Sequence, residues 1–391
     1  MMFQHLQIPN ARERGMVGLA DLATRPLAWR PRPKAGPPRR ILLLRLERIG
    51  DLLMVLDAIG LARALAPGAD IDLAVGGWNA DLAALVPGLS RIDTIDAPWL
   101  TREGAGWTWP ALVAHARGWR ARRYDLVVNF EPDIRSNFLA WLSGGRRRAG
   151  YFTGGGGAFL TDAWAFDPTA HVAENAERLV RRAFGAAGEA AAPAPRTPLR
   201  VPDEARARAA ALLPQPGAPL IGVHASGGRP SKQWHPDRFG DAARQLAARH
   251  GATIVLTGGP ADRALVDQVA ARLTGVPVVD VSAQVDLVTL AAVLERLDVL
   301  VTGDTGPMHL AAAVGTPVAA LFGPSDPRRY GPAGGPHEIL RIDLWCSPCG
   351  LVRLPPVRCR NRVPECLEGI GVEAVVAAAE RLLSAGRGDR P

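Results

Sequence analysis

The feature that most constrains the fold of this chain is a repeated alternation of short apolar runs, Gly-containing turns and helix-like segments. Runs rich in Leu, Ile and Val begin at residue 41 and recur through most of the sequence. Because buried parallel strands are apolar on both faces and are joined by helices, this alternation predicts βαβ units. The expected strands are residues 41–46, 71–75, 124–130, 220–224, 252–258, 277–282, 297–303 and 317–323.

The expected strands fall into two groups, separated by a stretch that is rich in Ala and Pro and has no strand pattern. Such a composition is typical of a linker. We therefore predict an α/β protein with two doubly wound domains, residues 41–190 and 205–372, joined by a linker at residues 191–204. The domains are expected to face a cleft, because ligands of such sheets sit beyond the carboxyl ends of the strands. A helix and tail at residues 373–391 could cross back to the first domain.

Positive charge is concentrated at the start of the chain. Residues 1–40 contain eight Arg or Lys residues against Glu13 and Asp21, which accounts for six of the eight excess positive charges. The remainder is close to neutral, so no nucleic-acid partner is expected. We predict that residues 1–40 form a flexible basic extension, which either contacts anionic lipid headgroups or phosphorylated glycolipid, or is a solvated tail.

Apolar segments of the chain are all shorter than a membrane span requires, and the first residues lack the continuous apolar stretch of a secretory signal. The expected location is therefore the cytoplasm, with peripheral contact at the inner face of the cell membrane as one option.

The first domain opens with RLERIGDLLM, in which Gly50 and Asp51 follow the strand at residues 41–46. Gly50 permits a tight turn, and Asp51 is placed at a helix N-terminus. There it can act on a ligand or only cap the helix. The absence of G-x-G-x-x-G here, and of G-x-x-x-x-G-K-[ST] anywhere, argues against ordinary dehydrogenases and P-loop proteins.

In the second domain, the strand at residues 220–224 leads into a loop that contains Ser226 and Lys232. Small residues that expose backbone N–H groups beside a lysine are suited to a phosphate. Lys232 and Lys34 are the only lysines among 46 basic residues, which favours a need for a compact charge at this position. The alternative is a surface lysine whose stem packs on Trp234.

The stretch TGDTGPMHLA follows a later strand and begins a helix at its proline. The N–H groups of Thr305 and Gly306, together with His309, could hold a diphosphate, and Asp304 could accept hydrogen bonds from sugar hydroxyls. The alternative is a capped helix with a buried histidine. Asp262, after another strand, is placed either to accept hydrogen bonds from ribose hydroxyls or to complement the helix dipole.

Four motifs occur in order: RLERIGDLLM, SKQWHPDRFGDAARQL, LTGGPADRAL and TGDTGPMHLAAAVGTPVAALFGPSDPRRYGP. Together they closely resemble glycosyltransferase family nine, the ADP-heptose:lipopolysaccharide heptosyltransferases, over roughly residues 41–380. The resemblance implies a GT-B fold of two Rossmann-like domains, with the acceptor bound mainly by the first and the nucleotide sugar by the second. It also implies inverting, metal-independent transfer without a cofactor, from ADP-heptose onto a lipopolysaccharide core or related cell-envelope acceptor.

The resemblance assigns roles to the residues of these motifs. Asp51 corresponds to the general base, Asp304 to the ligand of the donor sugar, and Asp262 to the ribose ligand, where the family usually has a longer Glu. The diphosphate ligands implied in the same way are Ser226, Lys232, Thr305, Gly306 and His309. A GT-B nucleotide-sugar epimerase and a non-catalytic nucleotide-sugar-binding protein remain as alternatives.

All four cysteines lie late in the chain, at Cys346, Cys349, Cys359 and Cys366. The first pair has zinc-knuckle spacing, whereas six residues separate the second pair, which departs from the common zinc pattern. Structural zinc is one expectation, and reduced cysteines or disulfides are the others.

Three arginines and four consecutive glycines mark residues 145–164 of the first domain. This composition predicts either a mobile loop that meets acidic groups of the acceptor or a solvated turn.

Overall fold

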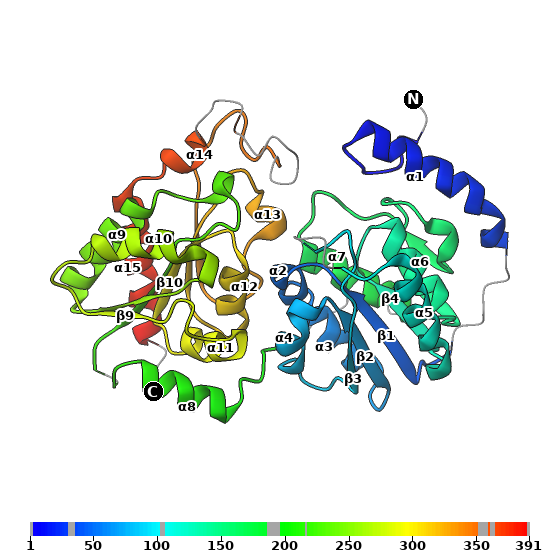
Figure 1. Ribbon diagram of the computed structural model, residues 1–391, viewed down its shortest axis with the longest axis horizontal. Coiled ribbons are helices and arrows are strands. Elements are labelled where there is room, and N and C mark those ends of the chain that lie inside the picture. The colour runs from blue at the N-terminus through cyan, green and yellow to red at the C-terminus, as the bar shows by residue number, and fades with distance from the viewer. Residues whose placement is uncertain are drawn as a thin grey trace. The chain divides into compact units, whose positions relative to one another are not determined.

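The computed structural model of the protein describes residues 3–29, 36–101, 106–185, 196–215, 217–350, 359 and 364–388. The chain divides into two compact units, Met1–Thr197 and Pro198–Pro391, and the division falls inside the predicted linker. Figure 1 shows a sheet covered by helices in each unit. Residues 191–195 of the predicted linker, residues 1–2 and 30–35 of the predicted N-terminal extension and residues 389–391 of the predicted tail lie outside the described residues.

The first unit contains a six-stranded sheet in which every neighbouring pair is parallel. Its strands are β1 (Arg40–Arg45), β2 (Asp70–Val75), β3 (Arg91–Thr94), β4 (Leu126–Asn129), β5 (Arg147–Tyr151) and β6 (Asp162–Trp164). The order is β3-β2-β1-β4-β5-β6, so the chain reverses direction across the sheet between β1 and β4. In open α/β sheets, such a switch point is where ligands bind.

Helices of the first unit connect and cover these strands. They are α1 (Ala11–Thr24), α2 (Ile49–Leu53), α3 (Leu56–Leu65), α4 (Ala80–Ala84), α5 (Trp109–Gly118), α6 (Ile134–Leu142) and α7 (Val172–Ala183). Leu42 and Val127, on the neighbouring strands β1 and β4, are fully buried and belong to one hydrophobic core cluster. The continuous apolar sequence of β1 is thus explained by helices on both faces.

The second unit repeats the same strand order. Its strands are β7 (Leu220–His224), β8 (Thr253–Leu256), β9 (Val278–Asp280), β10 (Val299–Gly303), β11 (Val318–Leu321) and β12 (His337–Leu340). The order β12-β11-β10-β7-β8-β9 places the switch point between β7 and β10. The helices are α8 (Asp203–Leu212), α9 (Pro236–His250), α10 (Arg263–Ala271), α11 (Leu287–Glu295), α12 (Gly306–Ala313), α13 (Pro327–Tyr330), α14 (Glu365–Glu368) and α15 (Val372–Gly388).

The C-terminal helix α15 completes the second hydrophobic core. Its residues Val375, Val376 and Ala379 are buried in the same cluster as Trp234 and Phe239. It contacts α9, β10, β11 and β12, all of which belong to the second unit. The option of a crossing to the first domain stays a prediction.

All eight strands expected from the sequence are present, and so is the two-sheet α/β architecture. The sequence did not predict β3, β5, β6 and β12, which are short and carry charged residues. Three of these four strands lie at sheet edges, where charged side chains can face solvent.

Residues 145–164 do not form the predicted loop or turn, because they contain β5, β6 and the short 3-10 helix η4 (Gly157–Phe159). Two of the arginines have structural partners: Arg148 donates to the carbonyl oxygens of Gly145 and Phe159, and Arg147 pairs with Asp162.

The predicted flexible N-terminal extension is wrong over Ala11–Thr24, because these residues form α1. Asn10 caps the helix by accepting hydrogen bonds from the backbone N–H groups of Arg12 and Glu13.

Among the residues that the structure describes, no helix is both long and apolar enough to cross a membrane.

Candidate functional site

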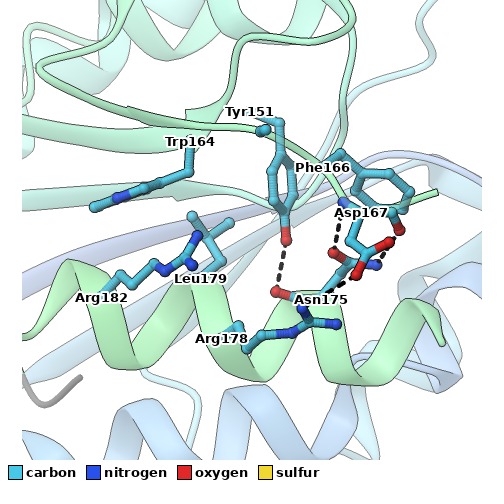
Figure 2. Close-up of a pocket in the computed structure, with 9 residues that line it drawn as sticks. Tyr151, Trp164, Phe166, Asp167, Asn175, Arg178, Leu179 and Arg182 are labelled. Carbon is cyan, nitrogen blue, oxygen red and sulfur yellow. Dashed lines mark hydrogen bonds and ion pairs between the residues drawn. The ribbon is translucent and has the colours of Figure 1, made fainter. Parts of the chain in front are cut away.

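A pocket of about 190 Å³ in the first unit lies beside the ends of β5 and β6, with helix α7 as its other wall (Figure 2). Tyr151 and Trp164 line it from the strands, and Arg178 and Arg182 line it from α7. Arg178 pairs with Asp167 at 3.3 Å, whereas the side chain of Arg182 makes no hydrogen bond or ion pair within the described part of the chain. A guanidinium beside aromatic rings is suited to an anionic group. None of the site residues predicted from the sequence lines this pocket.

Asp51 lies in the first turn of α2, at the switch point of the first sheet. Its Oδ2 accepts a hydrogen bond from the backbone N–H of Arg48 at 3.1 Å, so the capping role considered from the sequence is present. Its Oδ1 lies 3.3 Å from Nη2 of Arg45. The carboxylate is therefore held from two sides while it remains partly exposed, at 16% of its side-chain surface.

Arg45 is the last residue of β1, and its guanidinium is buried. Its Nε donates to the carbonyl oxygen of Asp51 at 3.0 Å, and its Nη1 lies 3.0 Å from Oε2 of Glu47. Burial by itself lowers the pKa of Arg45, but the nearby Glu47, Asp51 and Glu131 carboxylates raise it above its ordinary value. Arg45 is thus a permanent buried cation at the base of the site.

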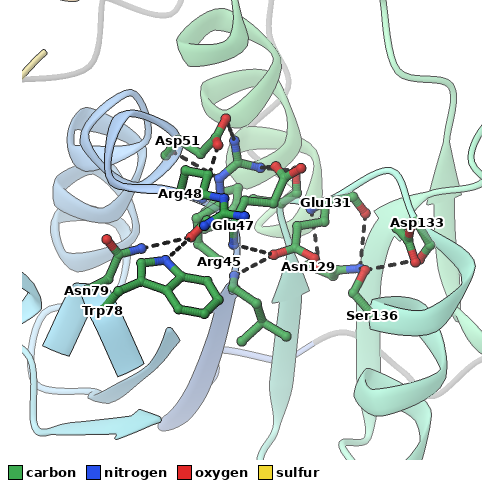
Figure 3. Close-up of polar contacts among 12 residues, drawn as sticks. Arg45, Glu47, Arg48, Asp51, Trp78, Asn79, Asn129, Glu131, Asp133 and Ser136 are labelled. Atoms are coloured by element: carbon green, nitrogen blue, oxygen red, sulfur yellow. Dashed lines mark hydrogen bonds and ion pairs between the residues drawn. The ribbon is translucent and has the colours of Figure 1, made fainter. Parts of the chain in front are cut away.

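Glu131 follows β4, and its buried side chain points toward Arg45 and the loop between β1 and α2 (Figure 3). Its Oε1 accepts hydrogen bonds from the backbone N–H groups of Leu46 and Glu47, which begin the loop that leads to Asp51. Burial, followed by the charge of Glu47, raises the pKa of Glu131 to about 8, although Arg45 opposes this shift. Glu131 therefore carries a proton at neutral pH in the folded protein.

Further hydrogen bonds fix the loop between β1 and α2. The side-chain N–H groups of Trp78 and Asn79 both donate to the carbonyl oxygen of Glu47 at 2.9 Å. Asn129 donates to the carbonyl oxygen of Glu131 at 3.1 Å, which fixes the end of β4 (Figure 3). Asp51 is consequently carried on a loop whose backbone and neighbouring charges are held in place.

The second unit places the Ser226 loop directly after β7. The Oγ of Ser226 accepts a hydrogen bond from the N–H of Gly228 at 3.3 Å. A Cβ added to Gly227 would lie 2.6 Å from the backbone carbon and oxygen of Lys232, so the two ends of this loop touch. Only glycine permits this approach, and the approach brings Lys232 back to the end of β7.

Lys232 and Asp304 form a short ion pair, with 2.6 Å between Nζ and Oδ2. Both side chains are largely buried, at 18% and 10% exposure. Lys232 comes from the loop after β7 and Asp304 follows β10, so the pair lies at the switch point of the second sheet. The two residues were predicted from separate motifs, and the structure brings them together.

Helix α12 begins beside this ion pair, with Thr305 as the residue that precedes its first turn. The Thr305 side chain makes no capping hydrogen bond within the described residues, and its Oγ1 lies 3.3 Å from Oγ1 of Thr302. Thr305 and Gly306 are partly exposed, whereas His309 is buried. The first amides of α12 are thus not satisfied by a cap side chain, which leaves them suited to an anion.

His224 ends β7 and was not singled out from the sequence. Its Nδ1 lies 3.1 Å from Oγ1 of Thr257, and burial lowers the pKa of His224 to about 4. The imidazole is therefore neutral at pH 7 and adds no charge to the site. A single histidine at the end of an apolar run gives no sequence signal that separates it from a core residue.

Asp262 has a structural role in the turn before α10. Its Oδ2 accepts a hydrogen bond from the N–H of Gly259 at 2.8 Å and closes the turn before α10. Asp262 follows β8, the strand next to β7, so it lies at the same sheet edge as the Ser226 loop. Its contact with a ribose stays a prediction.

The four cysteines are free thiols. Burial, followed by the nearby charges of the other three cysteines, raises the pKa of Cys366 to about 11. Within the described residues, no group of three or more His, Cys, Asp or Glu side chains is arranged to hold a metal ion. The zinc and disulfide alternatives stay predictions.

Two solved glycosyltransferase structures have the same architecture as this chain. A glycosyl transferase family 9 structure from Veillonella parvula has a TM-score of 0.74 and 25% identity, and the match covers 89% of this chain and 97% of that chain. The E. coli heptosyltransferase WaaC with ADP-2-deoxy-2-fluoro heptose has a TM-score of 0.64 and 19% identity, covering 88% of this chain and 99% of that chain. The fold is therefore GT-B, two parallel α/β sheets with polar residues at each switch point.

Sequence comparison defines the family within that class. The profile described as glycosyltransferase family 9 (heptosyltransferase) matches residues 112–353. Lipopolysaccharide heptosyltransferase 1 of Pseudomonas aeruginosa is 27% identical over 332 residues, which cover 79% of this chain and 86% of that protein. The chain belongs to glycosyltransferase family 9, the heptosyltransferase family, and is a glycosyltransferase.

Proposed function

We propose that this enzyme transfers heptose from ADP-heptose to a hydroxyl of a lipopolysaccharide core or related cell-envelope acceptor, with inversion and without a metal ion. The name of the Pseudomonas relative and the ADP-heptose analogue named with the E. coli structure support this choice of substrates. The observation that carries the proposal is the Lys232–Asp304 ion pair at the second switch point, beside the start of α12.

On the donor side, the proposed ligands of the diphosphate are a lysine, the amides of a helix N-terminus and nearby polar side chains. They are Ser226, Lys232, Thr305, Gly306 and His309. Asp304 holds Lys232 in place and accepts hydrogen bonds from the donor sugar, and Asp262 is the proposed ribose ligand. A helix N-terminus and a lysine can neutralise the charge that develops on the leaving diphosphate, which is the role a metal ion has in other transferases.

On the acceptor side, Asp51 is the proposed general base. It takes the proton of the acceptor hydroxyl as the hydroxyl oxygen bonds to the anomeric carbon. The bond from that carbon to the diphosphate breaks on the opposite face, and its electron pair leaves with ADP. Arg45 holds the Asp51 carboxylate at 3.3 Å, so the base is oriented before the acceptor arrives.

The first unit also offers basic groups for an acidic acceptor, because Arg178 and Arg182 line its pocket.

Since lipopolysaccharide-type acceptors carry a lipid, we propose that the enzyme works in the cytoplasm, in peripheral contact with the inner face of the membrane.

The test combines purified enzyme, ADP-heptose and a lipid A or core acceptor. We expect ADP release that requires the acceptor, an inverted anomeric configuration in the product by NMR, and unchanged rates in EDTA. The proposal fails if no nucleotide sugar yields nucleoside diphosphate with any such acceptor. An epimerase, the main enzymatic alternative, would change the sugar of the donor in the absence of any acceptor.

A further inference from the structure

Helix α1 has one face that packs on the first unit. Asp21 accepts a hydrogen bond from the N–H of Gly156 at 2.6 Å, and burial raises the pKa of its carboxyl. A Cβ on Gly155 would lie 2.3 Å from Cγ1 of Val17, so the helix rests directly on the glycine run. Gln7, before the helix, bonds to the backbone of Thr153. The orientation of α1 on the unit is therefore fixed.

Helix α1 is the dark blue helix of Figure 1, and its outer face carries exposed apolar side chains. Met16, Leu19 and Leu22 are 66%, 62% and 38% exposed. They are three of the seven large apolar residues that are exposed in the described part of the chain, and they lie at spacings of three on one helix. Such a concentration marks an interaction surface rather than scattered exposure.

Exposed basic residues flank this face. Arg12 and Arg25 are exposed near the two ends of α1. Residues 1–40 carry eight basic residues against two acidic ones, and one of the acidic residues, Asp21, is turned toward the glycine run. Glu13 is the other acidic residue, and it lies in the first turn of the helix.

We propose that the outer face of α1, defined by Met16, Leu19 and Leu22, docks on an anionic lipid bilayer. A helix with an apolar face and basic neighbours lies in the membrane interface, with its apolar side chains below the headgroups. Basic residues then add attraction to anionic lipid. A second copy of the chain fits less well, because three side chains cover far less than the roughly 800 Å² per partner of a stable protein interface.

This proposal names the surface that makes the membrane contact suggested under the proposed function, and it rests on that contact. It does not depend on the reacting residues, because the experiment contains neither donor nor acceptor. A loss of vesicle binding would leave the proposed transfer intact, and a loss of transfer would leave the docking surface intact.

The experiment is flotation of the full chain with phosphatidylcholine vesicles, with and without one third phosphatidylglycerol. We expect binding to the anionic vesicles only, weakened by salt. The double variant M16Q/L19Q should bind roughly tenfold more weakly, because two apolar side chains no longer leave water. R12Q/R25Q should also bind more weakly and lose part of the salt dependence.

Leu212, on α8 of the second unit, is 36% exposed and provides the matched control. L212Q should bind vesicles as the unchanged protein does, and all variants should keep the same melting temperature within about 2 °C. The proposal is overturned if the unchanged protein does not bind anionic vesicles, or if M16Q/L19Q binds them equally well. A dimer that M16Q/L19Q converts to a monomer, without vesicle binding, would assign this face to a second copy.

Discussion

The Asp51 carboxylate accepts hydrogen bonds from the backbone N–H of Arg48 and from the guanidinium of Arg45. Asparagine keeps one side-chain oxygen, so it can still accept from the N–H of Arg48. We therefore expect D51N to fold normally and to lose transfer by at least about 100-fold, because the base is gone. Donor affinity should stay within about twofold, as measured by calorimetry. D81N, at an exposed aspartate in the first turn of α4, is the control and should keep its activity. A matching loss of donor binding in D51N would contradict the role of base.

Glu131 makes stability depend on pH, with a sign set by its raised pKa. The folded protein keeps a proton on Glu131 up to about pH 8, whereas an unfolded glutamate loses it near pH 4.5. Its contribution to stability is thus full below pH 4.5 and is lost as the pH rises to about 8. E131Q keeps an oxygen for the loop amides and has no proton to lose.

We therefore expect the stability of E131Q relative to the unchanged protein to rise from pH 5 to pH 8, by on the order of a few kcal/mol, with a plateau above pH 8. Urea unfolding at several pH values measures this difference. E174Q, at an exposed glutamate of α7, controls for the loss of one carboxylate. An equal stability change for E131Q at every pH would contradict the prediction.

The Lys232–Asp304 pair allows its structural and binding roles to be separated. K232M leaves Asp304 buried without its cation, so we expect a stability loss of about 1–3 kcal/mol and a 10- to 100-fold weaker affinity for ADP. The double variant K232M/D304N should recover most of the stability and none of the affinity. Recovery of both, in thermal melts and calorimetry, would mean that Lys232 serves only its partner.

At the scale of single residues, the sequence predicted which residues belong to the candidate site, but not which side chains they contact. Asp51, Lys232 and Asp304 follow strands in turns, where polar residues stand out. Arg45 lies within an apolar strand and Glu131 just after one, so nothing local shows that these two ionisable side chains are buried together. Their pairing depends on β1 and β4 lying side by side, although 85 positions separate Arg45 from the carbonyl of Phe130 that it contacts.

At the scale of elements, the Ser226 loop reaches its position through one glycine. G227A places a methyl group 2.6 Å from the backbone of Lys232, so the loop must open. We expect at least tenfold weaker ADP binding, with a small loss of stability. G217A is the control, because a Cβ there meets nothing within 4 Å. Unchanged affinity of G227A in calorimetry would show that the closed loop is not needed.

Elements with a continuous apolar sequence were predicted correctly, and those shaped by their neighbours were not. The central strands are apolar throughout because helices cover them, so composition alone identifies them. Strands such as β3 (RIDT) and β12 (HEIL) lie at edges and carry charges, so they resemble loops. Helix α1 has a weak apolar pattern because its outer face is apolar too, and this conceals its attachment to the glycine run.

At the scale of the whole molecule, the two units repeat one strand order, yet the predicted donor ligands all lie in the second. We therefore expect ADP to slow hydrogen exchange in residues 225–232 and 303–309, and to leave residues 45–51 unchanged. Mass spectrometry of the full chain measures both regions at once. Protection of residues 45–51 by ADP alone would contradict the assignment of the nucleotide to the second unit.

The position of α15 in the second core has a consequence for synthesis of the protein. All six strands of the first unit precede residue 165, whereas the core around β10, β11 and β12 stays open until Val375, Val376 and Ala379 have been made. Domains fold in order as the ribosome releases them. A growing chain therefore acquires the unit that carries Asp51 first, and chains stopped before residue 372 would expose apolar strands to cellular quality control.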